Sequence, residues 1–139
     1  MLLYPKFLQK FAKKWRKFAV IFENDFLFIE RENAQIPWLK IFTKEPFKEL
    51  TDCPQALRDE LWRVVQLCEL ALREFYKPDK INIASFANYL PRVHFHIMAR
   101  FNEDEFFPES MWGQPQRAKK ELNLAEFSEF VTLLREKLR

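Results

Sequence analysis

The sequence predicts an α+β domain built on an antiparallel sheet of about five strands, with a long central helix and a C-terminal helix. Segments with a 3.6-residue apolar period alternate with short segments rich in β-branched and aromatic residues. The chain has 139 residues, 48% of them hydrophobic and 31% charged, which is enough for one core without disulfides or metals. No repeat or linker divides it, so residues 1–139 are expected to form a single domain.

Four strands are expected from composition. Residues 26–30 and 37–43 are rich in aromatic and β-branched residues and flank a polar segment, which is typical of an antiparallel hairpin. Residues 81–86 and 93–101 are expected to form two further strands, joined by a short connection. Together these segments predict a sheet with the helices outside it.

Two helices follow from apolar periodicity. Asp52 can cap the long central helix, and Pro78 prevents its continuation. Its apolar positions keep a 3.6-residue period: Leu57, Leu61, Val64, Val65, Cys68, Leu72 and Phe75. Asn123 with Glu126 resembles a capping box, which predicts a C-terminal helix over residues 123–139.

Residues 1–19 are expected to contain a basic amphipathic helix. This segment carries six lysine and arginine residues and no acid, with Phe7, Phe11, Trp15 and Phe18 at helical spacing. Such a helix can contact nucleic acid or an anionic membrane. Its narrow apolar stripe instead favours docking on the helix's own domain, with the lysines in solvent.

The remaining bulk features favour a cytoplasmic protein. No stretch approaches the roughly 20 uncharged apolar residues that span a bilayer, and lysines soon follow Leu2 and Leu3, so no apolar signal core forms. Cys53 and Cys68 are too few for a disulfide framework. Cys68 lies on the apolar stripe of the central helix and is interpreted as a reduced core thiol.

The two histidines of the chain stand in one predicted strand, within Arg92-Val93-His94-Phe95-His96-Ile97. Strand side chains alternate, so Arg92, His94 and His96 project from one face. Three interpretations are open. Both rings can be ordinary surface residues, or they can bind a metal together with carboxylates such as Asp104 or Glu105. They can also serve phosphate chemistry, in which one imidazole attacks phosphorus while its neighbour holds the phosphate oxygens.

A resemblance favours the phosphate chemistry. The run Phe86-Ala87-Asn88-Tyr89-Leu90-Pro91-Arg92-Val93-His94-Phe95-His96-Ile97 resembles the block His-φ-His-φ-His-φ-φ of the histidine-triad (HIT) family, which Gly-Asn or Gly-Gln precedes. Further pieces follow the order of a bacterial branch of histidine-triad or diadenosine-tetraphosphate-hydrolase-like proteins: Ile36-Pro37-Trp38-Leu39 upstream, then Ala99-Arg100-Phe101, Asp104, Pro108 and Trp112-Gly113. The resemblance covers residues 20–115 as the family core and implies a HIT-like fold and a homodimer with two equivalent clefts.

The resemblance also implies roles for individual residues. His94 matches the middle histidine, the family's nucleophile, and His96 matches the third, which donates hydrogen bonds to a phosphate oxygen or the leaving group. Asn88 matches the amide that contacts the phosphate, and Asn82 is a weaker match in the substrate site. Arg92 takes the place of the first histidine; because a guanidinium is a permanent cation with donors only, it can clamp phosphate but cannot exchange a proton.

The function that the resemblance implies is a nucleotide-binding hydrolase or transferase. It would act at the α-phosphate of a dinucleoside polyphosphate or a nucleoside phosphoramidate through a nucleotidyl-His94 intermediate. No cofactor is required for this covalent chemistry, although a divalent cation can accompany a polyphosphate substrate. Three departures from the family pattern leave open a catalytically weak or inactive nucleotide-binding or regulatory protein: Arg92, Ala87 in place of glycine, and Tyr89 in place of a small residue.

Three further residues near the motif have structural interpretations. Trp38 is expected in the core, and Trp112 with Gly113 is expected to serve packing and a turn. Arg100 either lines the site or pairs with an acid at the end of its strand.

Overall fold

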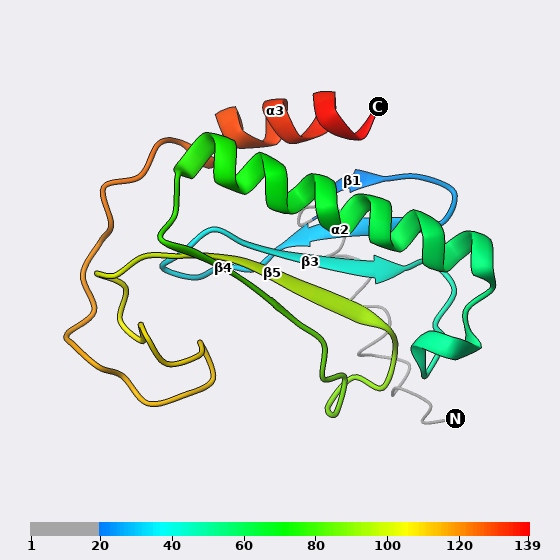
Figure 1. Ribbon diagram of the computed structural model, residues 1–139, viewed down its shortest axis with the longest axis horizontal. Coiled ribbons are helices and arrows are strands. Elements are labelled where there is room, and N and C mark those ends of the chain that lie inside the picture. Colours follow the sequence, from blue (N-terminus) through cyan, green and yellow to red (C-terminus); the bar gives the residue numbers. More distant parts are fainter. Residues whose placement is uncertain (1–19) are drawn as a thin grey trace, which may run out of the picture.

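Residues 20–139, which the computed structural model describes, contain one five-stranded sheet and two α-helices (Figure 1). The strands are β1 (Val20–Glu23), β2 (Leu27–Arg31), β3 (Trp38–Thr43), β4 (Lys80–Ala84) and β5 (His94–Arg100). Their order is β1-β2-β3-β5-β4, and every neighbouring pair is antiparallel. The predicted α+β class is confirmed, whereas the helix expected within residues 1–19 lies outside the described residues.

Helices α2 (Gln55–Tyr76) and α3 (Phe127–Leu138) cover the same face of the sheet (Figure 1). Buried aliphatic side chains fill the space between the layers: Leu61, Val64 and Leu72 from α2, and Leu27, Ile29, Leu39, Ile41 and Ile97 from the strands. Each contributes about 1.5–3 kcal/mol through burial. Cys68 is completely buried in this core, and burial raises the pKa of its thiol. No helix among the described residues is both long and apolar enough to cross a membrane.

The start of α2 differs from the prediction. Asp52 does not cap it, because this residue ends a short 3-10 turn, η1 (Leu50–Asp52), where its carboxylate accepts the Glu49 N–H at 3.1 Å. Pro54 occupies the N-cap position of α2 instead. The helix ends as expected before Pro78, because Lys77 adopts a left-handed conformation with φ 49° and donates its N–H to Arg73.

The start of α3 also differs from the prediction. The helix begins at Phe127, so Asn123 does not form the expected capping box, and Glu126 is the N-cap. The preceding chain is held in an irregular path by contacts with the hairpin of β2 and β3. Gln35 donates its side-chain amide to the Lys120 carbonyl at 2.6 Å, and the Arg31 guanidinium lies 4.0 Å from the Phe127 ring centroid. These tertiary contacts override the local capping signal.

The two faces of β5 have different environments. Its odd-numbered side chains, from Phe95 to Ala99, belong to the core under α2. Strand alternation therefore sends the even-numbered residues to the other face: His94, His96, Met98 and Arg100. The β3 residues opposite the first three are Phe42, Lys40 and Trp38. Together these β3 and β5 residues form one surface of the sheet, which we call the histidine face.

Candidate active site

His94 is fixed by its own strand and by β3. The ring is only 7% exposed and stacks on Phe42, with centroids 4.9 Å apart and planes 16° from parallel. Its Nδ1 atom lies 2.8 Å from the backbone carbonyl oxygen of Arg92. Because a carbonyl only accepts, Nδ1 must carry the hydrogen, which leaves the lone pair of the neutral ring on Nε2. A buried imidazole with a lone pair on Nε2 is a nucleophile held in one orientation.

His96 has the opposite arrangement of hydrogen and lone pair. The indole N–H of Trp38 donates to His96 Nδ1 at 3.0 Å, so the hydrogen of the neutral ring is on Nε2. Burial lowers the pKa of His96 to about 4, with further contributions from His94 and Lys40. His96 is therefore a neutral hydrogen-bond donor at pH 7. The centroids of the two imidazoles are 5.1 Å apart, so both can face one small anion.

An aromatic cluster borders His96. The Trp112 ring packs edge-on against His96 at 5.0 Å, against Trp38 at 5.3 Å and against Phe86 at 5.0 Å between centroids. Trp38 is buried, as expected for a core residue, but it also bonds a site residue. Trp112 packs, as expected, and does so next to a histidine while remaining 49% exposed.

Arg92 lies at the other end of the histidine pair. Its backbone carbonyl holds His94, and its guanidinium donates to the Thr43 carbonyl at the end of β3. The guanidinium carbon is 5.8 Å from the Phe28 ring centroid and 5.6 Å from that of Phe42. The first position of the triad motif therefore still orients His94, through the backbone rather than through a side chain.

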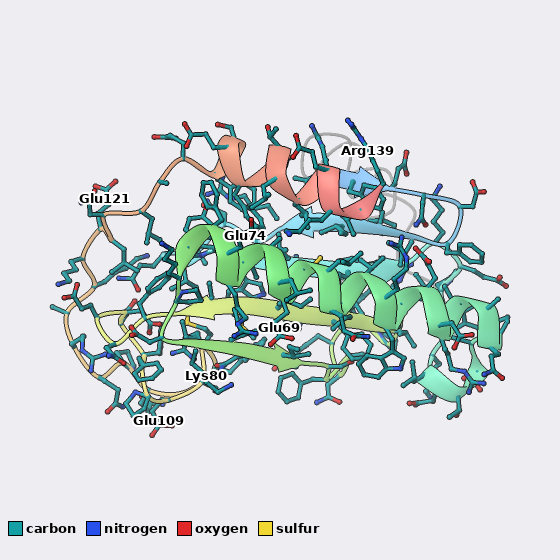
Figure 2. All side chains as sticks on the ribbon, turned by 45° about the horizontal axis from the view of Figure 1, so that its top comes forward. Glu69, Glu74, Lys80, Glu109, Glu121 and Arg139 are labelled. Carbon is teal, nitrogen blue, oxygen red and sulfur yellow. The ribbon has the colours of Figure 1, made fainter. Side chains whose placement is uncertain are left out.

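Arg100 pairs with an acid. This confirms one of the two interpretations of this residue, the other being that it lines the site. Its Nε donates to Asp104 at 2.9 Å, and both side chains are almost completely buried. Arg100 also donates to Asn82 at 2.7 Å and to the Glu109 carbonyl at 2.7 Å. Burial raises the pKa of Asp104, but the hydrogen bonds from Arg100 and from backbone N–H groups outweigh it, so the net pKa is lowered. The pair ties β5 to the loop that carries Trp112; Glu109 in this loop is labelled in Figure 2.

The metal interpretation loses its best candidate ligand in this arrangement, because the Asp104 carboxylate is engaged by Arg100 and by three backbone N–H groups. Among residues 20–139, no group of three or more His, Cys, Asp or Glu side chains is positioned to hold a metal ion. The two asparagines predicted for the substrate site have different surroundings. Asn82 belongs to the Arg100 network, and Asn88 is exposed in the connection between β4 and β5, next to Ala87 with φ 56°.

A cavity of about 750 Å³ lies elsewhere, between the hairpin of β2 and β3 and the segment that leads into α3. Arg31, Tyr76 and Phe127 line it together with Glu121, which is labelled in Figure 2. The lining of this cavity includes neither histidine. The candidate site is therefore the surface of the sheet around the two histidines, and not this cavity.

Two residues of the site were not assigned to it from the sequence: Trp38 as the partner of His96, and Phe42 as the ring under His94. The signal was present in the alternation of β3, which puts Trp38, Lys40 and Phe42 on one face. This signal points to the site only when the pairing of β3 with β5 is known, and the sequence alone does not show that pairing.

Comparisons with known proteins agree with this fold. A family model described as HIT domain matches residues 12–103. The chain is similar to the solved structure of a histidine triad protein from Bradyrhizobium japonicum, with 26% identity and a TM-score of 0.70, covering 99% of this chain and 98% of that one. It is also similar to a histidine triad (HIT) protein from Sinorhizobium meliloti, with 20% identity, a TM-score of 0.70, and coverage of 89% and 93%.

A third similar structure is a histidine triad protein from Marinobacter aquaeolei, with 18% identity, a TM-score of 0.67, and coverage of 90% of this chain and 93% of that one. A comparison with curated proteins finds no match. The family model spans more than half of the chain and includes both histidines. The chain therefore belongs to the HIT domain family.

Proposed function

We propose that this HIT protein binds nucleotides and transfers or hydrolyses at the α-phosphate of a nucleoside phosphate, through a nucleotidyl group carried on His94. One observation supports this most strongly: the two imidazoles share one face of β5 in complementary tautomers. His94 presents a lone pair on Nε2, and His96 presents a hydrogen on Nε2. A nucleophile and a donor with centroids 5.1 Å apart suit attack on a phosphorus atom whose oxygens are hydrogen-bonded.

The proposed reaction has two displacements. His94 Nε2 attacks the α-phosphorus, an N–P bond forms, and the bond to the leaving oxygen or nitrogen breaks with its electron pair going to the leaving group. His96 Nε2–H donates a hydrogen bond to a phosphate oxygen or the leaving atom, and Asn88 provides a neutral amide donor. Water then attacks phosphorus, and the N–P bond breaks with its electron pair returning to His94 Nε2. The proton that this water loses to solvent balances the proton that the leaving group takes up from solvent as it departs. The nucleoside monophosphate and the free imidazole are released.

The substrate classes that fit are dinucleoside polyphosphates and nucleoside phosphoramidates, because both join a nucleoside 5′-phosphate to a displaceable group. The covalent route requires no resident cofactor. A divalent cation that accompanies a polyphosphate would bind the substrate's own phosphate oxygens.

A second candidate function is a nucleotide-binding module with weak or no turnover. The position of Arg92 favours it, because a guanidinium that donates to the Thr43 carbonyl stands where the family motif has its first histidine. Calorimetry with AMP and hydrolysis assays with adenosine 5′-phosphoramidate and diadenosine tetraphosphate separate the two functions. Binding together with turnover supports the enzyme, binding without turnover supports the module, and no nucleotide binding contradicts both.

Replacing Arg92 with alanine is expected to raise KM about 10-fold while changing kcat less than about 3-fold, because a permanent cation beside the histidines attracts the phosphate equally before and during reaction. Steady-state kinetics with adenosine 5′-phosphoramidate measures both constants. Arg73→Ala is the matched control, since Arg73 is exposed on α2, on the far side of the sheet. A fall in kcat at unchanged KM for Arg92→Ala would contradict the assignment.

We also propose that the protein forms a homodimer through the edge of the sheet at β4. Strand β4 is at the end of the sheet order, and Figure 2 shows Lys80 at this edge. Ile83 on β4 and Trp62 on α2 are each 44% exposed, so the edge carries apolar surface as well as backbone hydrogen-bonding groups. Sedimentation velocity tests the dimer: a species at the monomer mass of 17.0 kDa at all concentrations would contradict it.

A further inference from the structure

We propose that Trp38 is a positioning residue of the active site, whose indole N–H holds His96 in the tautomer with a bare Nδ1 and a hydrogen on Nε2. The catalytic consequence depends on the function proposed above, whereas the tautomer itself does not. Without the Trp38 N–H, His96 could carry its single hydrogen on Nδ1 or rotate its ring, and in either case Nε2 would no longer donate to the phosphate.

The contact has only one chemical interpretation. An indole nitrogen is a donor and never an acceptor, so the 3.0 Å distance between Trp38 Nε1 and His96 Nδ1 requires a lone pair on the imidazole atom. The two residues are diagonal neighbours across β3 and β5, because Trp38 faces Met98 and Lys40 faces His96 in the strand register. Aromatic side chains bridge such diagonal positions.

Trp38 is itself held in place. Its side chain is buried, and its ring belongs to a small apolar cluster with Ile36 and Met98. Trp112 packs edge-on against both partners of the hydrogen bond, with interplanar angles of 76° to Trp38 and 80° to His96. Rotation of the indole would therefore require the cluster to repack.

The charges around His96 leave the ring neutral. The titratable groups that act on His96 are His94 on β5, Lys40 on β3 and Glu32 just beyond β2. Lys40 is 2.7 Å from Glu32, so these two charges largely offset each other. Burial and the donor on Nδ1 both favour the neutral ring. His96 then offers one hydrogen, on Nε2, over the whole neutral pH range.

The test uses the full-length protein with ¹⁵N-labelled histidine, in which only two imidazoles contribute signals. We expect the wild type to show His96 with a bare Nδ1 and a protonated Nε2 from pH 8 down to about pH 5, since the pKa of His96 is about 4. A His94→Gln sample assigns the two rings. In Trp38→Phe, which keeps an aromatic ring but lacks the donor, the His96 Nδ1 signal and titration midpoint are expected to move, and kcat to fall about 10-fold at nearly constant KM.

Tyr76→Phe is the control, because it likewise keeps an aromatic ring and removes a donor, and Tyr76 packs on Phe130 at the helix-covered face, so the imidazole signals and kcat should stay unchanged. Two results would overturn the proposal: a wild-type His96 with its hydrogen on Nδ1, or a Trp38→Phe spectrum identical to the wild type. If Trp38→Phe does not fold, the test uses the NMR signal of the Trp38 indole proton in the wild type. This signal must shift as His96 Nδ1 becomes protonated, because the indole N–H then loses its acceptor. If the spectra behave as expected in a protein without turnover, the proposed enzyme fails and the positioning role of Trp38 stands.

Discussion

Replacing His94 with alanine is expected to lower kcat/KM for a nucleoside phosphoramidate by at least about 10⁴-fold, because no other described group can take over its role. His96 is the nearest imidazole, but its Nδ1 lone pair accepts the Trp38 N–H and its Nε2 carries a hydrogen. The measurement is steady-state hydrolysis followed by chromatography of the released nucleoside monophosphate. The fold should persist, because loss of one ring stacked on Phe42 costs only a few kcal/mol.

His96→Ala is the matched comparison, since it removes the second imidazole of the chain from the same strand. A hydrogen-bond donor contributes less than a nucleophile, so a fall of about 10²-fold is expected. Circular dichroism and urea unfolding of both variants separate lost chemistry from lost structure. Hydrolysis by His94→Ala within a factor of about three of the wild type would show that His94 is not the nucleophile.

Replacing Asp104 with alanine is expected to have the largest effect on stability, a loss of about 3–5 kcal/mol, because it leaves the charge of Arg100 buried without its partner. The carboxylate also accepts the N–H groups of Phe101, Phe106 and Phe107, which would lose that acceptor. A domain of this size has a total free energy of unfolding of about 5–15 kcal/mol, so the loss is a large fraction. Urea unfolding measures it.

Glu103→Ala is the control for this variant, because Glu103 is the preceding acid and forms an exposed ion pair with Lys120 at 3.2 Å. Such a surface pair contributes less than about 1 kcal/mol. The Asp104 network also ties the loop of Trp112 to β5, so tryptophan fluorescence of Asp104→Ala should change before global unfolding. Equal unfolding midpoints for the two variants would contradict the structural role assigned to Asp104.

The sequence predicts most of the fold because its patterns are local. The apolar period of α2 and the composition of β2 to β5 are properties of consecutive residues. The short strand β1 was not located, because its four residues become a strand only by pairing with β2. Its turn depends on the Asn24 side chain, which accepts the N–H groups of Phe26 and Leu27.

The site, like the fold, is predicted from the sequence only as far as it depends on consecutive residues. Strand alternation is sufficient to bring His94 and His96 to one face, next to each other. It does not determine their tautomers, because His94 depends on a backbone carbonyl and His96 depends on Trp38, which is 58 residues away in the chain. The sequence likewise leaves the partner of Arg100 open, because Asp104 meets Arg100 only through the path of the loop that follows β5.

The central claim is that His94 Nε2 forms a bond to phosphorus, and mass spectrometry of the intact bond tests it most directly. The protein is incubated with adenosine 5′-phosphoramidate, denatured at alkaline pH to preserve the N–P bond, and digested. We predict an adenylyl group on the peptide that contains both histidines, with fragmentation assigning it to His94, and no adduct in His94→Ala. Full hydrolytic activity with the adenylyl group on any other residue would contradict the claim.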